Sequence, residues 1–148
     1  MLYFDTSFLT PLILEEPTSG GIETFFANLT GEVLCVSHWT RVEFCSLMGR
    51  EVRMGGFTGA DALIIIREFD ELVADSYQVL LPSAADYEVA KGYIQDFATK
   101  LRAGDALHLA IAHNNGAEAL YTLDEGLLNA AKLLRIPASR GIKISQSR

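Results

Sequence analysis

The sequence predicts an α/β fold in which a central parallel sheet of four to five strands is covered by helices on both faces. Short apolar segments alternate with longer amphipathic segments along the 148 residues, which is the pattern of strands joined by crossover helices. No internal repeat, low-complexity stretch or linker interrupts this alternation. A chain of this length is most simply one domain, so we expect a single domain over residues 1–148 that needs no metal or disulfide to hold it together.

The N-terminal part is predicted to form a strand followed by two helices. An apolar run over residues 2–4 stops at Asp5, so we expect a buried strand that delivers this carboxylate to the edge of the sheet. Apolar residues at helical spacing follow as far as Pro17, whose ring cannot continue a helix. Gly20 and Gly21 then predict a loop before a second amphipathic helix.

The middle of the chain is predicted to form two strands separated by a helical hairpin. Residues 33–36 are apolar and β-branched, and Ser37 after them is a good helix cap. The helix that follows is broken by glycines, and a second helix with a strong apolar face begins after Thr58. Residues 77–81 read as the next strand, which Pro82 ends.

The C-terminal part continues the alternation. One of its helices is apolar nearly all round, which predicts that it is buried against the sheet, and the helix before it is expected to turn Phe97 inward. The tail from about residue 140 is expected to be partly disordered. The expected elements are helices over 84–99, 104–113 and 125–134, and strands over 119–122 and, weakly, 141–144.

Composition limits the classes of function. Twelve basic against nineteen acidic residues give a net charge of −7, which by itself argues against nonspecific nucleic-acid binding. Cys35 and Cys45 form neither a C-x-x-C pair nor a zinc-like cluster, so we expect reduced core thiols. No signal peptide or membrane-spanning run is recognisable, and a soluble, cytoplasmic protein is expected.

Four carboxylates stand at corresponding ends of predicted elements: Asp5 after the first strand, Glu43 on the helix after the second, Asp105 at the start of the buried helix and Asp124 after the fourth strand. Because parallel strands end at the same edge of a sheet, we expect these carboxylates to lie close together. Two like charges about 4 Å apart repel by about 4 kcal/mol at an effective dielectric near 20, and a divalent cation removes that cost. Carboxylates without thiol or imidazole ligands suit Mg²⁺ or Mn²⁺.

Each acid also has a purely structural explanation. Asp5 could cap the first helix, and Asp105 could complement a helix dipole. Thr40 and Glu43 match a capping box, although Ser37 is the better cap and would leave Glu43 in mid-helix. For Asp124 the alternative is a capping box formed by the residues on either side of it, Thr122 and Glu125.

Four short motifs then resemble those of a known family. Residues 3–7, 42–43, 104–110 and 121–124 are similar, in order and placement, to the four acidic motifs of PIN-domain ribonucleases. The early first motif, the chain length and the helical hairpin resemble the toxins of VapBC-type toxin-antitoxin modules. The resemblance covers nearly the whole chain and implies a three-layer α/β/α fold with an inserted helical hairpin.

The resemblance also implies a function: a Mg²⁺- or Mn²⁺-dependent endoribonuclease that hydrolyses RNA phosphodiester bonds through a metal-activated water. The four acids would be the metal ligands, with Asp5 and Asp105 the strongest candidates. A cognate antitoxin and a homodimer are implied as partners. Polar residues that match family positions beside the acids, and that we expect to orient a carboxylate, water or phosphate, are Thr6, Ser7 and Thr122.

Basic residues near the motifs are candidates for contacts with RNA phosphates, since bound cations can invert the local charge. These are Arg41, Lys100 and Arg102, and a solvated surface charge is the alternative for each. We expect His108, one turn after Asp105, to be a core residue or to lie just behind the site rather than to act as a general base.

Other classes of function also depend on the residues near Asp5. A haloacid-dehalogenase-like phosphatase needs D-x-D after the first strand, and a DEDD exonuclease needs D-x-E, but Ser7 occupies that position. A stand-alone PIN nuclease outside a toxin-antitoxin module stays open. A non-catalytic regulatory partner also stays open, and in it Phe8, Leu12, Phe25 and Phe26 could form a groove or a dimer face.

Overall fold

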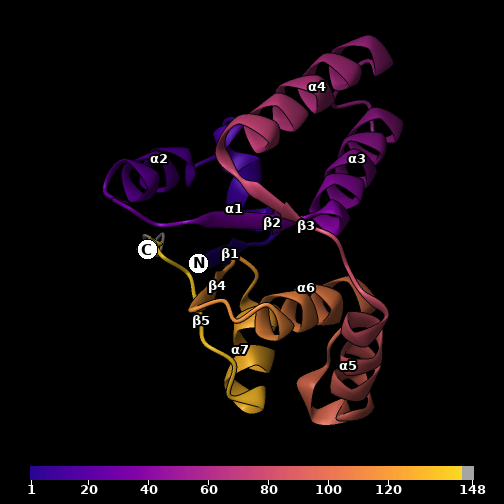
Figure 1. Ribbon diagram of the computed structural model, residues 1–148. Helices are drawn as coiled ribbons and strands as arrows, with labels where there is room; N and C mark the ends of the chain where they lie inside the picture. The colour runs from indigo at the N-terminus through magenta and orange to yellow at the C-terminus, as the bar shows by residue number, and fades with distance from the viewer. Residues whose placement is uncertain (145–148) are drawn as a thin grey trace.

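The computed structural model describes residues 1–144, and these form three layers with a parallel sheet in the middle (Figure 1). The order across the sheet is β3-β2-β1-β4-β5, and every neighbouring pair is parallel. The predicted α/β fold class with a parallel sheet is therefore confirmed. The strands are β1 (Leu2–Phe4), β2 (Leu34–Ser37), β3 (Gln78–Leu80), β4 (Ala119–Tyr121) and β5 (Ala138–Ser139).

Two groups of helices cover the two faces of the sheet (Figure 1). One group comprises α1 (Thr6–Leu9), the 3-10 helix η1 (Thr10–Leu12), α2 (Ser19–Ala27), α3 (His38–Arg53) and α4 (Gly59–Ser76). The other comprises α5 (Ala84–Gln95), η2 (Phe97–Thr99), α6 (Ala103–Asn114) and α7 (Glu125–Leu134). Within residues 1–144, none of these helices has the length and apolarity to cross a membrane.

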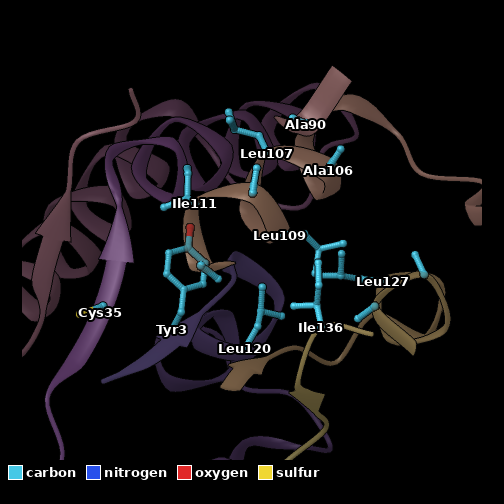
Figure 2. Close-up of a cluster of buried hydrophobic side chains, with 14 residues drawn as sticks. Tyr3, Cys35, Ala90, Ala106, Leu107, Leu109, Ile111, Leu120, Leu127 and Ile136 are labelled. Carbon is cyan, nitrogen blue, oxygen red and sulfur yellow. The ribbon is translucent and has the colours of Figure 1, made fainter. Parts of the chain in front are cut away.

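The alternating side chains of the strands divide the core into two clusters, one on each face of the sheet. Tyr3 of β1 belongs to the cluster under α5, α6 and α7, whereas its neighbours Leu2 and Phe4 belong to the cluster under α1 to α4. Figure 2 shows Tyr3 and Leu120 directed toward the buried face of α6, as the apolar character of that helix predicts.

The predicted helical hairpin is formed by α3 and α4. The rings of Phe44 and Phe69 stack between the two helices, with centroids 4.0 Å apart and planes 9° from parallel. Thr58 caps α4 as expected, because its side chain accepts a hydrogen bond from the backbone of Asp61. The hairpin projects from the sheet as a distinct arm (Figure 1).

Some sequence expectations near the N-terminus were wrong. The first helix ends earlier than predicted, at η1, well before Pro17. Gly20 and Gly21 lie inside the first turn of α2 and do not form a loop. A Cβ on Gly21 would lie 3.4 Å from the side chain of Ile142, so the C-terminal segment passes beside the helix at this residue.

Two expectations near the C-terminal half were also wrong. The helix predicted over 84–99 ends at Gln95, and Phe97 in the following turn is 82% exposed rather than inward. The last strand is Ala138–Ser139, ahead of the predicted 141–144. Ile142, within the tail expected to be disordered, packs against the core, and the remainder of that tail, 145–148, lies outside the described residues.

The residues considered for an apolar groove are buried or partly buried in the hydrophobic core. Phe8 is fully buried, and its ring packs in an aromatic cluster with Phe4, Phe25 and Tyr121. Phe25 and Phe26 are half-buried in the same cluster.

Candidate active site

The topology brings the ends of β1 and β4 together at the centre of the sheet. The chain adds β2 and β3 on one side of β1 and then returns to add β4 on the other. In open parallel sheets, such a reversal leaves a crevice beyond the carboxyl ends of the strands. Here the crevice holds a cavity of about 260 Å³, which is lined by Asp5, Thr6, Ser7, Thr10, Glu43, Leu47, Asp105 and Asp124.

Asp5 is held at this crevice by hydrogen bonds to both carboxylate oxygens. Its Oδ1 accepts from the hydroxyl of Ser7 at 2.7 Å and from the backbone N–H of Phe8 at 3.1 Å. Its Oδ2 accepts from the hydroxyl of Thr122 at 2.6 Å. Asp5 thus caps α1, as the structural alternative proposed, and it lines the cavity as well.

Ser7 and Thr122 also tie the ends of β1 and β4 to each other. The backbone N–H of Leu123 donates to Ser7 Oγ at 3.0 Å, and that of Asp124 donates to Thr122 Oγ1 at 3.0 Å. Thr122 is fully buried. The two hydroxyls therefore orient Asp5 and hold the loop that carries Asp124.

Glu43 reaches the cavity from the second turn of α3. Ser37 forms the capping box of this helix with Thr40, so Glu43 is not used as a cap. Its Oε1 accepts a hydrogen bond from Thr6 Oγ1 at 2.6 Å and also bonds Nε2 of His108. His108 is 1% exposed and lies behind the cavity.

Asp105 and Asp124 are the other two carboxylates that line the cavity. Asp105 lies in the first turn of α6. Asp124 is the N-cap of α7, where its Oδ1 accepts from the backbone of Leu127 at 2.9 Å. The capping box considered for its neighbours Thr122 and Glu125 is therefore wrong, because Asp124 itself is the cap.

Burial and mutual repulsion shape the titration of the acids. Burial, followed by the charges of Asp124 and Asp5, raises the pKa of Asp105 to about 6. Burial also raises the pKa of Asp5, against the opposing effects of His108 and of its hydrogen bonds. Burial of Glu43 acts in the same direction, but the hydrogen bond and charge of His108 and the hydrogen bond from Thr6 outweigh it, so its pKa is lowered.

The donor set fits a hard divalent cation. Carboxylate and hydroxyl oxygens line the cavity, and no thiol or imidazole does, which favours Mg²⁺ or Mn²⁺ over zinc. Within residues 1–144, no three Asp, Glu, His or Cys side chains converge closely enough to form a finished metal cage. The capping bonds of Asp5 and Asp124 explain part of this spacing, because each holds its carboxylate toward its own helix.

The three basic residues considered for phosphate contacts are exposed, and none lines the cavity. Arg41 pairs with Asp70 of α4, with Nε 3.3 Å from Oδ1. Lys100 follows η2 in a left-handed backbone conformation, and Arg102 is the N-cap residue of α6.

Two further lining residues, Thr10 and Leu47, were not anticipated. Each lies four residues after a residue of the site, Thr10 after Thr6 and Leu47 after Glu43. Side chains four apart share a helix face. That spacing was the signal that would have found them.

Comparison with known proteins places this geometry in context. The PIN domain family profile matches residues 2–133. No curated protein sequence matches the chain. Several solved structures share the fold at low identity. Mycobacterium tuberculosis VapC20, a Sarcin-Ricin loop cleaving toxin, is 19% identical with a TM-score of 0.69, over 88% of this chain and 95% of that one.

Two toxin-antitoxin structures are similar in the same way. VapBC-1 from nontypeable Haemophilus influenzae is 17% identical with a TM-score of 0.64, over 94% of this chain and 97% of that one. VapBC2 from Rickettsia felis, bound to a DNA fragment from its promoter, is 13% identical with a TM-score of 0.66, over 94% and 98%. At these identities the likeness concerns the fold.

Proposed function

The chain belongs to the PIN domain family, and from that membership we propose that it is a metal-dependent endoribonuclease and the toxin of a toxin-antitoxin module. The observation that carries the proposal is the convergence of Asp5, Glu43, Asp105 and Asp124 on one cavity. They come from four separate parts of the chain. Burial raises the pKa of Asp105, and repulsion from Asp124 and Asp5 raises it further, as expected for four acids around a small cavity.

The four acids would hold Mg²⁺ or Mn²⁺ at this cavity. Asp105 is the strongest candidate for direct contact, because no hydrogen bond within residues 1–144 engages its carboxylate. A bound cation would supply the positive charge that stabilises the scissile phosphate and activates water for in-line attack. It would also offset the negative charge of the carboxylates that line the cavity, which favours a polyanionic substrate there.

The remaining polar residues would set the geometry of the acids. Thr6 holds one oxygen of Glu43, while Ser7 and Thr122 hold both oxygens of Asp5. Their hydroxyls are committed to these bonds, so we assign them to orientation rather than to nucleophilic attack. Arg41, Lys100 and Arg102 are proposed to contact RNA phosphates outside the cavity.

The similarity to VapBC structures supports an antitoxin partner for this chain. We further propose a homodimer and a cytoplasmic location, with RNA as the substrate. A stand-alone PIN nuclease is the alternative, and a small antitoxin reading frame beside the gene would favour the toxin. The acids around the cavity favour a catalytic protein over a regulatory partner.

Cleavage of RNA by the purified protein, with Mg²⁺, with Mn²⁺ or with EDTA, tests this function. We expect metal-dependent cutting that falls at least about 100-fold in Asp5→Ala and Asp105→Ala variants whose circular dichroism shows a folded protein. Cutting that persists in EDTA, or in both folded variants, would refute the proposal. Co-expression with the neighbouring reading frame would test the partner separately.

A further inference from the structure

We propose that His108 is a positioning residue that fixes which carboxylate oxygen of Glu43 is presented to the metal. The inference rests on the proposed function, since it assigns a partner to one of the four acids. His108 does not line the cavity. It acts on the cavity only through its hydrogen bond to Glu43.

The two oxygens of Glu43 have different surroundings. Oε1 receives the hydroxyl of Thr6 at 2.6 Å and bonds Nε2 of His108. Within residues 1–144, no hydrogen bond involves Oε2. One oxygen is therefore committed to the protein, and the other is free to accept a ligand from the cavity.

Gly104 lies beside the free oxygen and leaves room for it. A Cβ at this position would lie 3.0 Å from Glu43 Oε2 and 3.4 Å from the ring of Trp39. A contact of 3.0 Å is tight, so a side chain at position 104 would push Glu43 Oε2 by a few tenths of an ångström. The carboxylate is thus held from one side by His108 and Thr6 and packed from the other against the first turn of α6.

The ring of His108 is itself anchored. Its Nδ1 shares a hydrogen bond of 2.7 Å with the hydroxyl oxygen of Tyr3, and that oxygen lies 2.9 Å from Ser37 Oγ. His108, Tyr3 and Ser37 are each at most 1% exposed. The resulting chain of hydrogen bonds joins α6, β1 and the N-cap of α3, and it ends at the carboxylate of Glu43.

Burying the polar ring of His108 costs free energy, which favours a functional reason for its presence. A buried polar ring needs partners for both nitrogens, and a leucine would fill the same space without that need. The partners of His108 are a site carboxylate and a tyrosine on the strand that carries Asp5. Groups that orient a metal ligand in this way typically contribute about 10- to 100-fold to metal affinity or activity.

Mn²⁺ binding by the purified protein, measured by titration calorimetry without RNA, tests the inference. His108→Leu keeps the apolar volume and removes both hydrogen bonds, so we expect Mn²⁺ affinity to fall by about 10- to 100-fold. His108→Gln can still donate to Glu43, and we expect it to recover most of the affinity. Ile111→Val, a fully buried change on the same helix outside this network, is the matched control and should leave the affinity unchanged.

The outcomes separate the two proposals. A parent protein that binds no Mn²⁺ would overturn the metal-dependent function and this inference with it. A parent that binds Mn²⁺, with a folded His108→Leu variant binding within about twofold of it, would overturn this inference alone. If His108→Leu does not fold, Tyr3→Phe replaces it, because it removes only the hydroxyl that anchors Nδ1. A Tyr3→Phe affinity about three- to tenfold weaker supports the inference, and an unchanged affinity overturns it.

Discussion

Replacing Asp105 by asparagine should make the metal-free protein more stable at neutral pH. The carboxylate is partly buried beside Asp124, Asp5 and Glu43, and its pKa of about 6 lies above the ordinary value of 3.8. A carboxyl group with a raised folded-state pKa binds protons more strongly in the folded protein. Its ionisation therefore lowers stability as the pH rises from about 4 to about 6, and the full cost remains above that range.

The size of the effect follows from the pKa. A rise from 3.8 to about 6 corresponds to about 3 kcal/mol at about 1.4 kcal/mol per pKa unit. Solvent screening of this partly exposed side chain reduces the figure to about 1–2 kcal/mol. Asparagine also loses the favourable interaction of an acid with the first turn of α6, which is worth about 0.5 kcal/mol. The net gain expected is about 1 kcal/mol, or about 2–4 °C in Tm.

Thermal and urea unfolding in EDTA would measure this gain. Asp105→Asn should exceed the parent at pH 7 and match it at about pH 3, which lies below both the folded and the unfolded pKa, so that the parent carboxyl is largely protonated in both states. Glu68→Gln, on the exposed face of α4, is the control and should change stability by less than about 0.5 kcal/mol. Equal or lower stability of Asp105→Asn at pH 7 would refute the electrostatic account of the cavity.

Three other predictions concern the site and the hairpin. Thr122→Val leaves an oxygen of buried Asp5 without its partner and should lower the urea-unfolding free energy by about 1–3 kcal/mol; no loss would contradict that bond. Phe69→Ala should cost about 3–5 kcal/mol in the same assay, whereas Ile64→Ala, at a residue 55% exposed, should cost less than about 0.5 kcal/mol; similar costs would contradict the packing of the hairpin. Excess EDTA should stop RNA cleavage and added Mg²⁺ or Mn²⁺ should restore it, and cutting without metal would contradict the proposed chemistry.

Much of the fold could be predicted because local signals and tertiary structure agree. The strand at residues 2–4 is apolar on both faces and is buried on both. Thr58 and Ser37 are good caps, and each begins a helix where expected. The all-apolar helix α6 is buried as its composition requires.

The failures arose where the local sequence pattern does not decide the structure. Gly21 is helical although glycine is a poor helix former, and the helix that contains it packs beside Ile142, which is far away in the sequence. Phe97 fits the helical apolar pattern, but the chain leaves the helix at Asp96 and turns the ring outward. Neither outcome could be recognised from the spacing of apolar residues alone.

The four acids could be gathered from the sequence because each lies near a recognisable boundary: Asp5 and Asp124 follow strands, and Glu43 and Asp105 lie in the first two turns of helices. Their hydrogen-bond partners could be predicted only in part. Thr6, Ser7 and Thr122 adjoin the acids in sequence, whereas His108 reaches Glu43 from 65 positions away. Asp124 both caps α7 and lines the cavity, so its capping role is compatible with the metal-binding role that we propose for it.

A crystal structure of the protein soaked in Mn²⁺, with anomalous diffraction data, would test the central claim most directly. The account predicts an anomalous peak in the crevice beyond β1 and β4, in contact with Asp105 and at least one of Asp5, Glu43 and Asp124. A peak only at other surface acids, or no peak at a Mn²⁺ concentration that supports RNA cleavage, would contradict the four-carboxylate metal centre.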